Sequence, residues 1–385
     1  MRPSKINPLN PARVALLKCR GLAQSEIAKR LGLSAATVSR LLSEGGQAHN
    51  FISPPTFDWA MLTGAQKAQL QALDDIEKLS PVLTERLLSL PHDSVRLTAT
   101  VIQAATDIGG PAQQHDFYVA AARAVWQLLT PVRTTRVIGV AWGETLSLLL
   151  EGARKSRLPV RYPDKKQPTI IPLCGESLGL TRLNNMSSSA LAQGFGEVLT
   201  SGKNEGYWSL SMIPVFLPGP KAFSSADVSA VKKLLSFSAA YTKIFGADDS
   251  DERALANQLD IVITSISREN RAFGVDTPDF VWDTLKLRQF VNLVIGDIAG
   301  VPLGRPGTTT KSLNALQRLW TGLQADHLRL CAQRASRGPN SPAGVIVVGR
   351  GRERVACVIE AVRRGLINHL IVDEELGRAL IDRLK

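Results

Sequence analysis

The sequence predicts an α/β domain built around a mostly parallel sheet, preceded by a small all-α domain. From about residue 94 onward, short apolar and β-branched runs alternate with helical stretches, which is typical of a parallel sheet with connecting helices. Before that point, residues 1–50 contain eight Lys or Arg side chains and two acidic ones, and so hold half of the net charge of +12. This basic segment is therefore the part of the chain best suited to contact a polyanion such as nucleic acid.

The expected elements follow this alternation along the chain. Helical periodicity extends from about 57 to 88, with leucine and isoleucine side chains on one face. The expected strands are 95–102, 136–140, 169–173, 260–267, 291–298, 344–348 and 368–372. The expected helices between them are 113–129, 144–155, 225–245, 312–335, 352–364 and 374–384.

A break in composition separates the basic segment from the rest. Gly45-Gly46 and Pro54-Pro55 lie in "SEGGQAHNFISPPTF", and both pairs are typical of turns or linkers. We therefore expect a helical domain over 1–52, a linker and helical dimerisation segment over 53–88, and an α/β domain over 89–385.

Composition excludes several classes of protein. No apolar run approaches the roughly 18 residues that span a bilayer, and the N-terminus does not resemble a secretory signal. The four cysteines lie far apart, which indicates buried thiols in a reducing compartment, and the five scattered histidines suggest no metal site. We expect a cytoplasmic protein that has neither metal nor cofactor.

The most specific local pattern is "GLAQSEIAKRLGLSAATVSRLLSEG". Gln24–Leu31 is predicted to form a short helix, and Gly32 supplies a turn residue that tolerates positive φ. Ser34 has the right chemistry to cap a second helix that starts at Ala35. Two helices joined by a tight glycine turn form a helix-turn-helix, whose second helix lies in the major groove of DNA.

The outer face of this motif is short and polar. Arg40 suits either a guanine edge or a phosphate, and the cations of the first helix suit phosphates. The open alternative is a helical hairpin that serves only packing. The expected DNA-contacting residues are Gln24, Ser25, Lys29, Arg30, Ser34, Ala35, Ala36, Thr37, Ser39 and Arg40.

Three strand-to-helix junctions share small and polar residues. Ligands of open parallel sheets bind beyond the carboxyl ends of the strands, where helix N-termini favour anions. The pattern therefore predicts a small anionic ligand such as a sugar phosphate, although packing explains such turns in many proteins. The junction residues are Gly143 and Thr145 in the first, Gly175, Glu176 and Ser177 in the second, and Arg350, Gly351, Arg352 and Arg354 in the third.

Carboxylates also collect near the predicted strand ends. They are suited to accept hydrogen bonds from sugar hydroxyls, but also to cap helices or to remain solvated. These residues are Asp260, Glu269, Asp297, Asp373 and Glu374.

Taken together, these motifs resemble the SorC family of bacterial sugar-responsive transcription regulators. "EIAKRLGLSAATVSRLL" is similar to the helix-turn-helix of that family, and "GVAWGETL" and "VIGDIAG" are similar to motifs of its effector domain. "GRGRERVACVIEAVRRGLINHLIVDEE" resembles its C-terminal signature. The resemblance implies an effector domain similar to ribose-phosphate isomerases and glucosamine-phosphate deaminases, in a homodimer or homotetramer that binds operator DNA.

The resemblance also implies roles for single residues. An effector would lie against Gly143, Glu144 and Thr145, with Asp297 near its hydroxyls and a cation at position 354 on its phosphate. The chain departs from the family pattern at Arg350 and Arg354, where glycine and lysine are usual, and at Val372, where threonine is usual. Arg354 keeps the positive charge, but it cannot form a Schiff base.

Three functions remain open on the sequence alone. The leading hypothesis is a DNA-binding regulator controlled by a carbohydrate effector. The second is a sugar-phosphate isomerase or deaminase with an accessory DNA-binding segment, although no histidine lies in the candidate loops. The third is a constitutive DNA-binding protein with a degenerate pocket.

Overall fold

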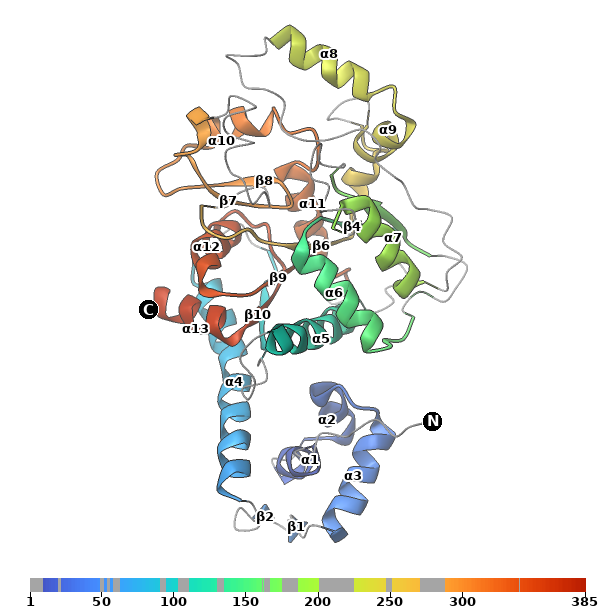
Figure 1. The fold of residues 1–385 in the computed structure, drawn as a ribbon, viewed down its shortest axis with the longest axis vertical. Helices are drawn as coiled ribbons and strands as arrows, with labels where there is room; N and C mark the ends of the chain where they lie inside the picture. The colour runs from blue at the N-terminus through green and yellow to red at the C-terminus, as the bar shows by residue number, and fades with distance from the viewer. Residues whose placement is uncertain are drawn as a thin grey trace. The chain divides into compact units, whose positions relative to one another are not determined.

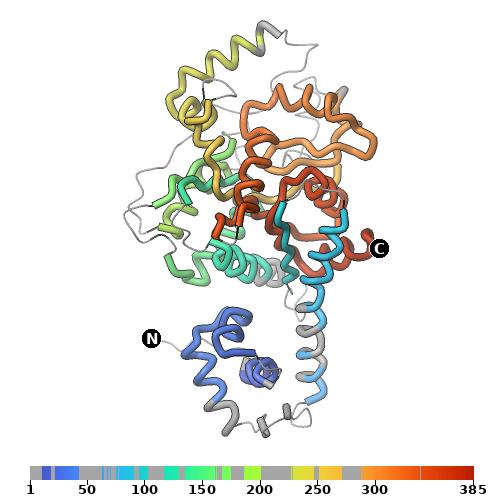
Figure 2. Tube along the Cα trace, turned by 180° about the vertical axis from the view of Figure 1, so that it is seen from behind, coloured from blue at the N-terminus to red at the C-terminus, as the bar shows by residue number. Residues whose placement is uncertain are grey.

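The computed structural model describes most of the chain, in two compact units that comprise residues 1–78 and 79–385. Figures 1 and 2 show their helices and strands from opposite sides. The described residues are 10–19, 22–48, 52–53, 56–57, 63–90, 95–102, 111–129, 135–160, 162, 167–174, 186–200, 225–246, 251–270, 288–338 and 340–385.

Three helices form the core of the first unit: α1 (Asn10–Cys19), α2 (Gln24–Leu31) and α3 (Ala35–Ala48). A two-helix hairpin cannot enclose its own apolar face, and α1, which the sequence analysis did not anticipate, covers it. A two-stranded antiparallel ribbon follows, made of β1 (Ile52–Ser53) and β2 (Thr56–Phe57). The buried core consists of Val14, Leu17, Ile27, Ala28, Val38 and Leu41.

The turn between α2 and α3 confirms the local prediction. Gly32 adopts φ of 63° and its N–H bonds to the carbonyls of Ala28 and Lys29, which ends α2. The Oγ of Ser34 accepts a hydrogen bond from the N–H of Thr37 at 3.0 Å and so caps α3. Glycine and serine therefore perform the two tasks that the sequence assigned to them.

A six-stranded sheet forms the centre of the second unit. Its spatial order is β3-β10-β9-β6-β4-β5, and every neighbouring pair is parallel. This confirms the predicted α/β fold. The strands are β3 (Thr98–Ile102), β4 (Val137–Val140), β5 (Thr169–Pro172), β6 (Ile261–Ser265), β9 (Gly344–Gly349) and β10 (His369–Asp373).

Helices flank this sheet. Helices α5 and α6 approach each other closely, since a Cβ at Gly152 would lie 2.6 Å from the carbonyl oxygen of Tyr118. The described helices of the second unit that follow β3 are α5 (Pro111–Leu128), α6 (Glu144–Lys155), α7 (Ser188–Leu199), α8 (Ser225–Leu235), α9 (Ala239–Phe245), α10 (Thr310–Gln317), α11 (Ala325–Ala335), α12 (Val355–Arg363) and α13 (Glu374–Arg383), of which α8 and α10 lie away from the sheet (Figure 1).

The end of helix α4 (Gly64–Leu88) protects the edge strand β3. The N–H of Val101 donates to Ser80 Oγ, and the N–H of Ala99 donates to Thr84 Oγ1, both at 2.9 Å. One helical turn separates the two hydroxyls, and they serve alternate residues of the strand. These bonds satisfy two backbone N–H groups that an edge strand would otherwise leave unpaired.

Two expectations differ from the structure. The run 291–298 contributes β7 (Val294–Ile298), which pairs with β8 (Val301–Gly304) in an antiparallel hairpin outside the parallel sheet. Ala299 and Gly300 between them have φ of 51° and 81°, the positive values that a tight hairpin turn requires. A continuous apolar run does not reveal strand direction, and a single alanine carries no obvious turn signal.

Two of the expected helices are each interrupted. The stretch 225–245 divides into α8 and α9, because Ser238 accepts a hydrogen bond from the N–H of Tyr241 at 3.3 Å and starts a new helix. The stretch 312–335 divides into α10 and α11 around a turn that holds Trp320 in the core. Among the described residues, no helix is both long enough and apolar enough to cross a bilayer.

Candidate functional site

The order of the strands defines a crevice between β4 and β6. The chain leaves β4 toward β5 on one side, whereas it leaves β6 toward β9 on the other side. Neighbouring strands whose connections diverge in this way form a crevice at their carboxyl ends, where ligands of open α/β sheets bind. The topology therefore predicts one site before any side chain is considered.

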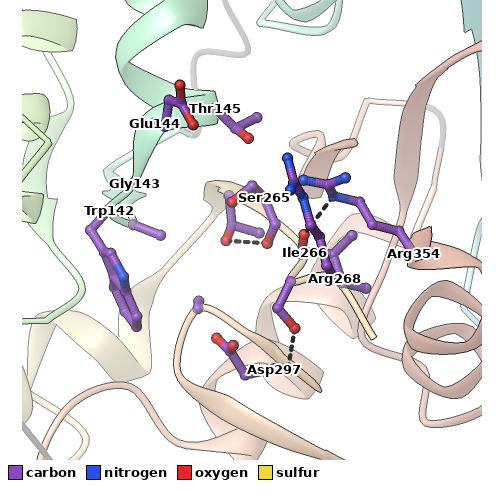
Figure 3. A pocket seen from close by; sticks show the side chains of 13 residues that line it. Trp142, Gly143, Glu144, Thr145, Ser265, Ile266, Arg268, Asp297 and Arg354 are labelled. Atoms are coloured by element: carbon purple, nitrogen blue, oxygen red, sulfur yellow. Dashed lines mark hydrogen bonds between the residues drawn. The ribbon is translucent and has the colours of Figure 1, made fainter. Parts of the chain in front are cut away.

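A pocket of about 180 Å³ lies in this crevice (Figure 3). Residues 141–145 after β4 and residues 264–268 at the end of β6 form most of its wall. Asp297 and Ala299 from the β7–β8 hairpin and Arg354 from the loop after β9 complete it.

The N-terminus of α6 forms one wall of the pocket. Gly143 has φ of 112° and ψ of 168°, a conformation open only to glycine, and it precedes the first helical residue. Glycine has no side chain that could cap the helix, so residue 143 leaves the first amide groups of α6 without a side-chain cap. A Cβ at Gly143 would also have nothing within 4 Å. Such a terminus favours an anion or a hydroxyl oxygen.

Asp297 lines the pocket and is hydrogen-bonded to Ser267, which follows β6. Its backbone N–H donates to Ser267 Oγ at 2.6 Å, and its Oδ2 accepts a hydrogen bond from the N–H of Gly300 at 3.0 Å. The carboxylate thus supports the hairpin turn and lines the pocket as well. A Cβ at Gly300 would lie 2.3 Å from the Trp320 ring, so glycine is required beside this tryptophan.

Arg354 is a cation held at a fixed position beside the pocket. Its side chain is 10% exposed, its Nε donates to the carbonyl oxygen of Ile266 at 3.1 Å, and its Nη1 bonds to the carbonyl oxygen of Arg350 and to Glu353. Burial lowers the pKa of Arg354, and the neighbouring Glu353 opposes that shift. An arginine stays protonated under these conditions, so the pocket keeps a fixed positive charge.

Tyr118 lies close enough to the pocket wall for the charged side chains there to shift the pKa of its phenol. Burial raises its pKa, whereas a hydrogen bond with Thr145 and the positive charges of Arg354 and Arg350 lower it. The neutral phenol therefore helps to hold the side chain of Thr145 at the start of α6.

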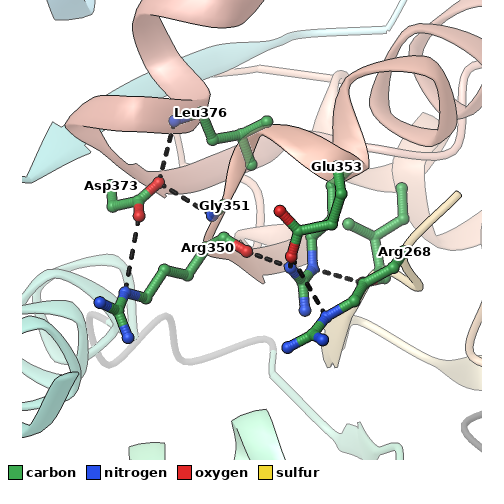
Figure 4. A network of polar contacts seen from close by, with 8 residues as sticks. Arg268, Arg350, Gly351, Glu353, Asp373 and Leu376 are labelled. Carbon is green, nitrogen blue, oxygen red and sulfur yellow. Dashed lines mark hydrogen bonds and ion pairs between the residues drawn. The ribbon is translucent and has the colours of Figure 1, made fainter. Parts of the chain in front are cut away.

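Arg350 and Gly351 belong to a neighbouring network (Figure 4). Asp373 Oδ1 accepts the N–H of Leu376 at 3.0 Å and that of Gly351 at 3.2 Å, and its Oδ2 lies 3.6 Å from Arg350 Nε. Burial raises the pKa of Asp373, and these partners oppose the shift. Asp373 is thus the cap of α13, and Arg350 pairs with it instead of lining the pocket.

The structure brings together five of the predicted effector-binding residues and places Arg350 and Gly351 in the neighbouring network. Gly143, Glu144, Thr145, Asp297 and Arg354 all line the pocket. The predicted residues Gly175, Glu176 and Ser177 lie outside the described residues. Of the other carboxylates, Asp260 accepts the N–H of Arg136 at 2.7 Å at the start of β6, far along the strand from the pocket.

The sequence analysis missed eight of the residues that line the pocket, among them Trp142, Ser265, Ser267 and Arg268. Trp142 stands beside Trp320, with ring centroids 5.7 Å apart, on the side of the pocket opposite the arginines (Figure 3). The sequence contains a signal for Trp142, since this residue directly precedes Gly143 at a predicted strand-to-helix junction. The residues after β6 had a weaker signal, because "TSISREN" contains no glycine turn.

The predicted DNA-contacting residues lie on the outside of the first unit. Ile27, Val38 and Leu41 face its core. Nine of the predicted residues are exposed and Thr37 is half-buried: the exposed ones are Gln24, Ser25, Lys29, Arg30, Ser34, Ala35, Ala36, Ser39 and Arg40. Their contacts with DNA stay a prediction.

Comparison with solved structures identifies this architecture. The full-length sorbitol operon regulator SorC from Klebsiella pneumoniae shares 18% identity, with a TM-score of 0.55 over 96% of this chain and 98% of that one. This chain has the SorC fold. No protein-family model and no curated protein matches the sequence.

Two further structures share the SorC fold over a smaller part of this chain. A transcriptional regulator from Streptococcus pneumoniae is 15% identical, with a TM-score of 0.55 over 81% of this chain and 98% of its own. A DeoR family transcriptional regulator from Listeria monocytogenes is 17% identical, with a TM-score of 0.51 over 80% of this chain and 99% of its own. At these identities the likeness is one of fold, and the expected resemblance to SorC is confirmed at that level.

Proposed function

We propose that this chain is a sequence-specific DNA-binding transcriptional regulator whose operator binding is modulated by a carbohydrate effector, a phosphorylated sugar or polyol. One observation carries the proposal: a chain with an exposed, polar helix-turn-helix also holds a pocket at the switch point of a parallel sheet, lined by a buried arginine. The SorC fold supports it, because the match covers 96% of this chain.

The first unit supplies the DNA contacts. Helix α3 would enter the major groove with Arg40 on a base edge or a phosphate, and the exposed cations Lys29 and Arg30 would bind phosphates. Two such units on a homodimer or homotetramer would bind two half-sites of an operator. We infer that the segment 53–88 contributes to this assembly.

The pocket suits a phosphorylated carbohydrate because its walls offer apolar, polar and positively charged contacts. The indole of Trp142 offers an apolar face for the C–H groups of a sugar ring or polyol chain. The hydroxyls of Thr145, Ser265 and Ser267 and the carboxylate of Asp297 offer partners for sugar hydroxyls. The guanidinium of Arg354 offers charge-assisted bonds for a phosphate.

The effector would act by binding two arrangements of the subunits unequally. A ligand with equal affinity for the DNA-bound and released states would shift nothing, however tightly it bound. Coupling between the pocket and operator affinity is therefore the property to measure.

The test uses the full-length protein and DNA selected from a random pool. We expect an enriched duplex that competes far better than random DNA, and release or retention of it on addition of a phosphorylated sugar or polyol. Binding that is equal on selected and random DNA would refute the proposal. Turnover of ribose 5-phosphate or glucosamine 6-phosphate would instead favour the enzyme, although no histidine is among the described residues of the pocket wall.

A further inference from the structure

A carboxylate of the protein itself lies between the two arginines of the pocket wall. Glu353 Oε1 is 2.8 Å from Arg354 Nη1 and 3.1 Å from Arg268 Nε (Figure 4). Both arginines line the pocket, whereas Glu353 does not. The inference below rests on the proposed function, since it concerns the ligand of the same site.

The loop is built to accommodate this carboxylate. Gly351 adopts φ of 91°, and a Cβ there would lie 2.5 Å from Glu353 Oε2 and 2.7 Å from Oε1. Any other residue at position 351 would compete with the carboxylate for space. The backbone of Glu353 is also anchored, because its carbonyl oxygen accepts the N–H of Glu269 at 2.8 Å.

The three side chains differ in exposure to solvent. The more exposed ones are free to change their conformation. The side chain of Arg354 is 10% exposed, whereas those of Glu353 and Arg268 are 41% and 49% exposed. Arg354 is the fixed cation, and Glu353 can rotate toward solvent without unpacking a core.

The positive charges around the pocket are already neutralised by carboxylates of the protein. Arg268 and Arg354 share Glu353 as a partner, and the pocket wall also contains the carboxylates of Glu144 and Asp297. A phosphate that enters the pocket needs the guanidinium groups of Arg268 and Arg354, which already bind the carboxylate of Glu353. The phosphate and this carboxylate would lie close enough for their negative charges to repel each other strongly. An uncharged sugar would not meet this opposition.

We propose that Glu353 is a specificity-determining residue: its carboxylate acts as an internal anion on the Arg268–Arg354 pair, and an anionic group of the effector binds by displacing it. Glu353 thereby lowers the affinity for free phosphate. A phosphorylated effector overcomes this cost through the contacts of its sugar moiety with the rest of the pocket.

The test measures binding to the full-length protein by calorimetry, with inorganic phosphate, sorbitol 6-phosphate and sorbitol as probes. Glu353→Gln keeps the shape of the side chain but removes its charge. We expect about a fivefold to tenfold gain in affinity for the two phosphate probes, which corresponds to loss of one partly screened like charge, and no change for sorbitol. Glu252→Gln, an exposed position that precedes β6, makes the same change in net charge and should alter none of the affinities.

A double variant tests whether the gain depends on the bridged arginine. Relative to Arg268→Gln alone, Arg268→Gln/Glu353→Gln should show a smaller gain for phosphate, because only the Arg354 guanidinium is then released. A gain of undiminished size there, or one that appears in Glu252→Gln, would show a general charge effect and overturn the proposal. Weaker or unchanged phosphate binding in Glu353→Gln would overturn it as well, and so would absence of phosphate binding in both proteins. An expected gain without any effect on operator binding would leave this proposal intact and contradict the proposed function instead.

Discussion

Arg354 Nε donates a hydrogen bond to the carbonyl oxygen of Ile266 at 3.1 Å, which joins the loop after β9 to the end of β6. The same guanidinium bonds to the carbonyl oxygen of Arg350 and faces the pocket. One side chain therefore holds two neighbouring strand ends together and places a positive charge in the crevice between β4 and β6.

Replacement of Arg354 by lysine should separate these two roles. Lysine keeps the charge but cannot supply the planar set of donors that reaches the carbonyls of Ile266 and Arg350. We expect a loss of about 1–3 kcal/mol in unfolding free energy, because a buried carbonyl is left unpaired, and weaker phosphate binding. Denaturant unfolding and phosphate titration measure both effects. Arg352→Lys, at an exposed position in the same loop, serves as the control, and an equal loss there would contradict the assignment.

Arg40→Ala should distinguish base recognition from phosphate contact. If Arg40 binds a guanine edge, the variant should lose about 1–3 kcal/mol on the selected operator and much less on random DNA. Arg30→Ala, on α2, should instead weaken both duplexes alike and reduce the salt dependence of binding. Fluorescence anisotropy at several salt concentrations measures this difference. Equal losses in Arg40→Ala on both duplexes would refute a base contact.

Ser34→Ala should destabilise the first unit through loss of a helix cap. The N–H of Thr37 would lose its partner at 3.0 Å, at a cost of about 1 kcal/mol. Ser39→Ala, within the same helix, lacks this capping role and should be neutral within about 0.5 kcal/mol. Hydrogen exchange of the α3 amides in the full-length protein measures both. Equal protection in wild type and Ser34→Ala would show that the cap contributes nothing.

His369 should make the second unit sensitive to acid. Burial lowers its pKa from 6.5 to about 4, and its Nδ1 lies 2.6 Å from Thr98 Oγ1. Between these two pKa values the unfolded chain binds a proton that the folded chain does not. The stabilisation is therefore complete above pH 6.5 and is lost as the pH falls toward 4.

The expected loss of stability is about 2 kcal/mol between pH 8 and pH 5. Chemical denaturation at a series of pH values measures it. His369→Gln should be less stable at pH 8 but show a flatter dependence on pH, so the slope is the informative quantity. A slope equal to that of the wild type would mean that other groups cause the acid sensitivity.

Local chemistry made much of the structure predictable. The turn at Gly32, the cap at Ser34 and the parallel strands needed only backbone preference and apolar patterning, which neighbouring residues express. The features that the sequence did not predict share a cause, since each depends on contact between separate elements. The direction of β7 depends on pairing with β8, and the role of α1 depends on a face that α2 and α3 leave open.

The sequence by itself determined which residue types stand at each strand end, and so the presence of Gly143, Asp297 and Arg354 as candidates. The family resemblance already implied that these three surround one effector, and the structure shows them lining one pocket. Only the tertiary structure decided that Arg350 pairs with Asp373 and that Glu353 lies between two arginines. The physical reason is that strand order brings together the ends of β4, β6 and β9, which are far apart along the chain. Contacts between side chains from such distant segments leave no periodic pattern in the sequence.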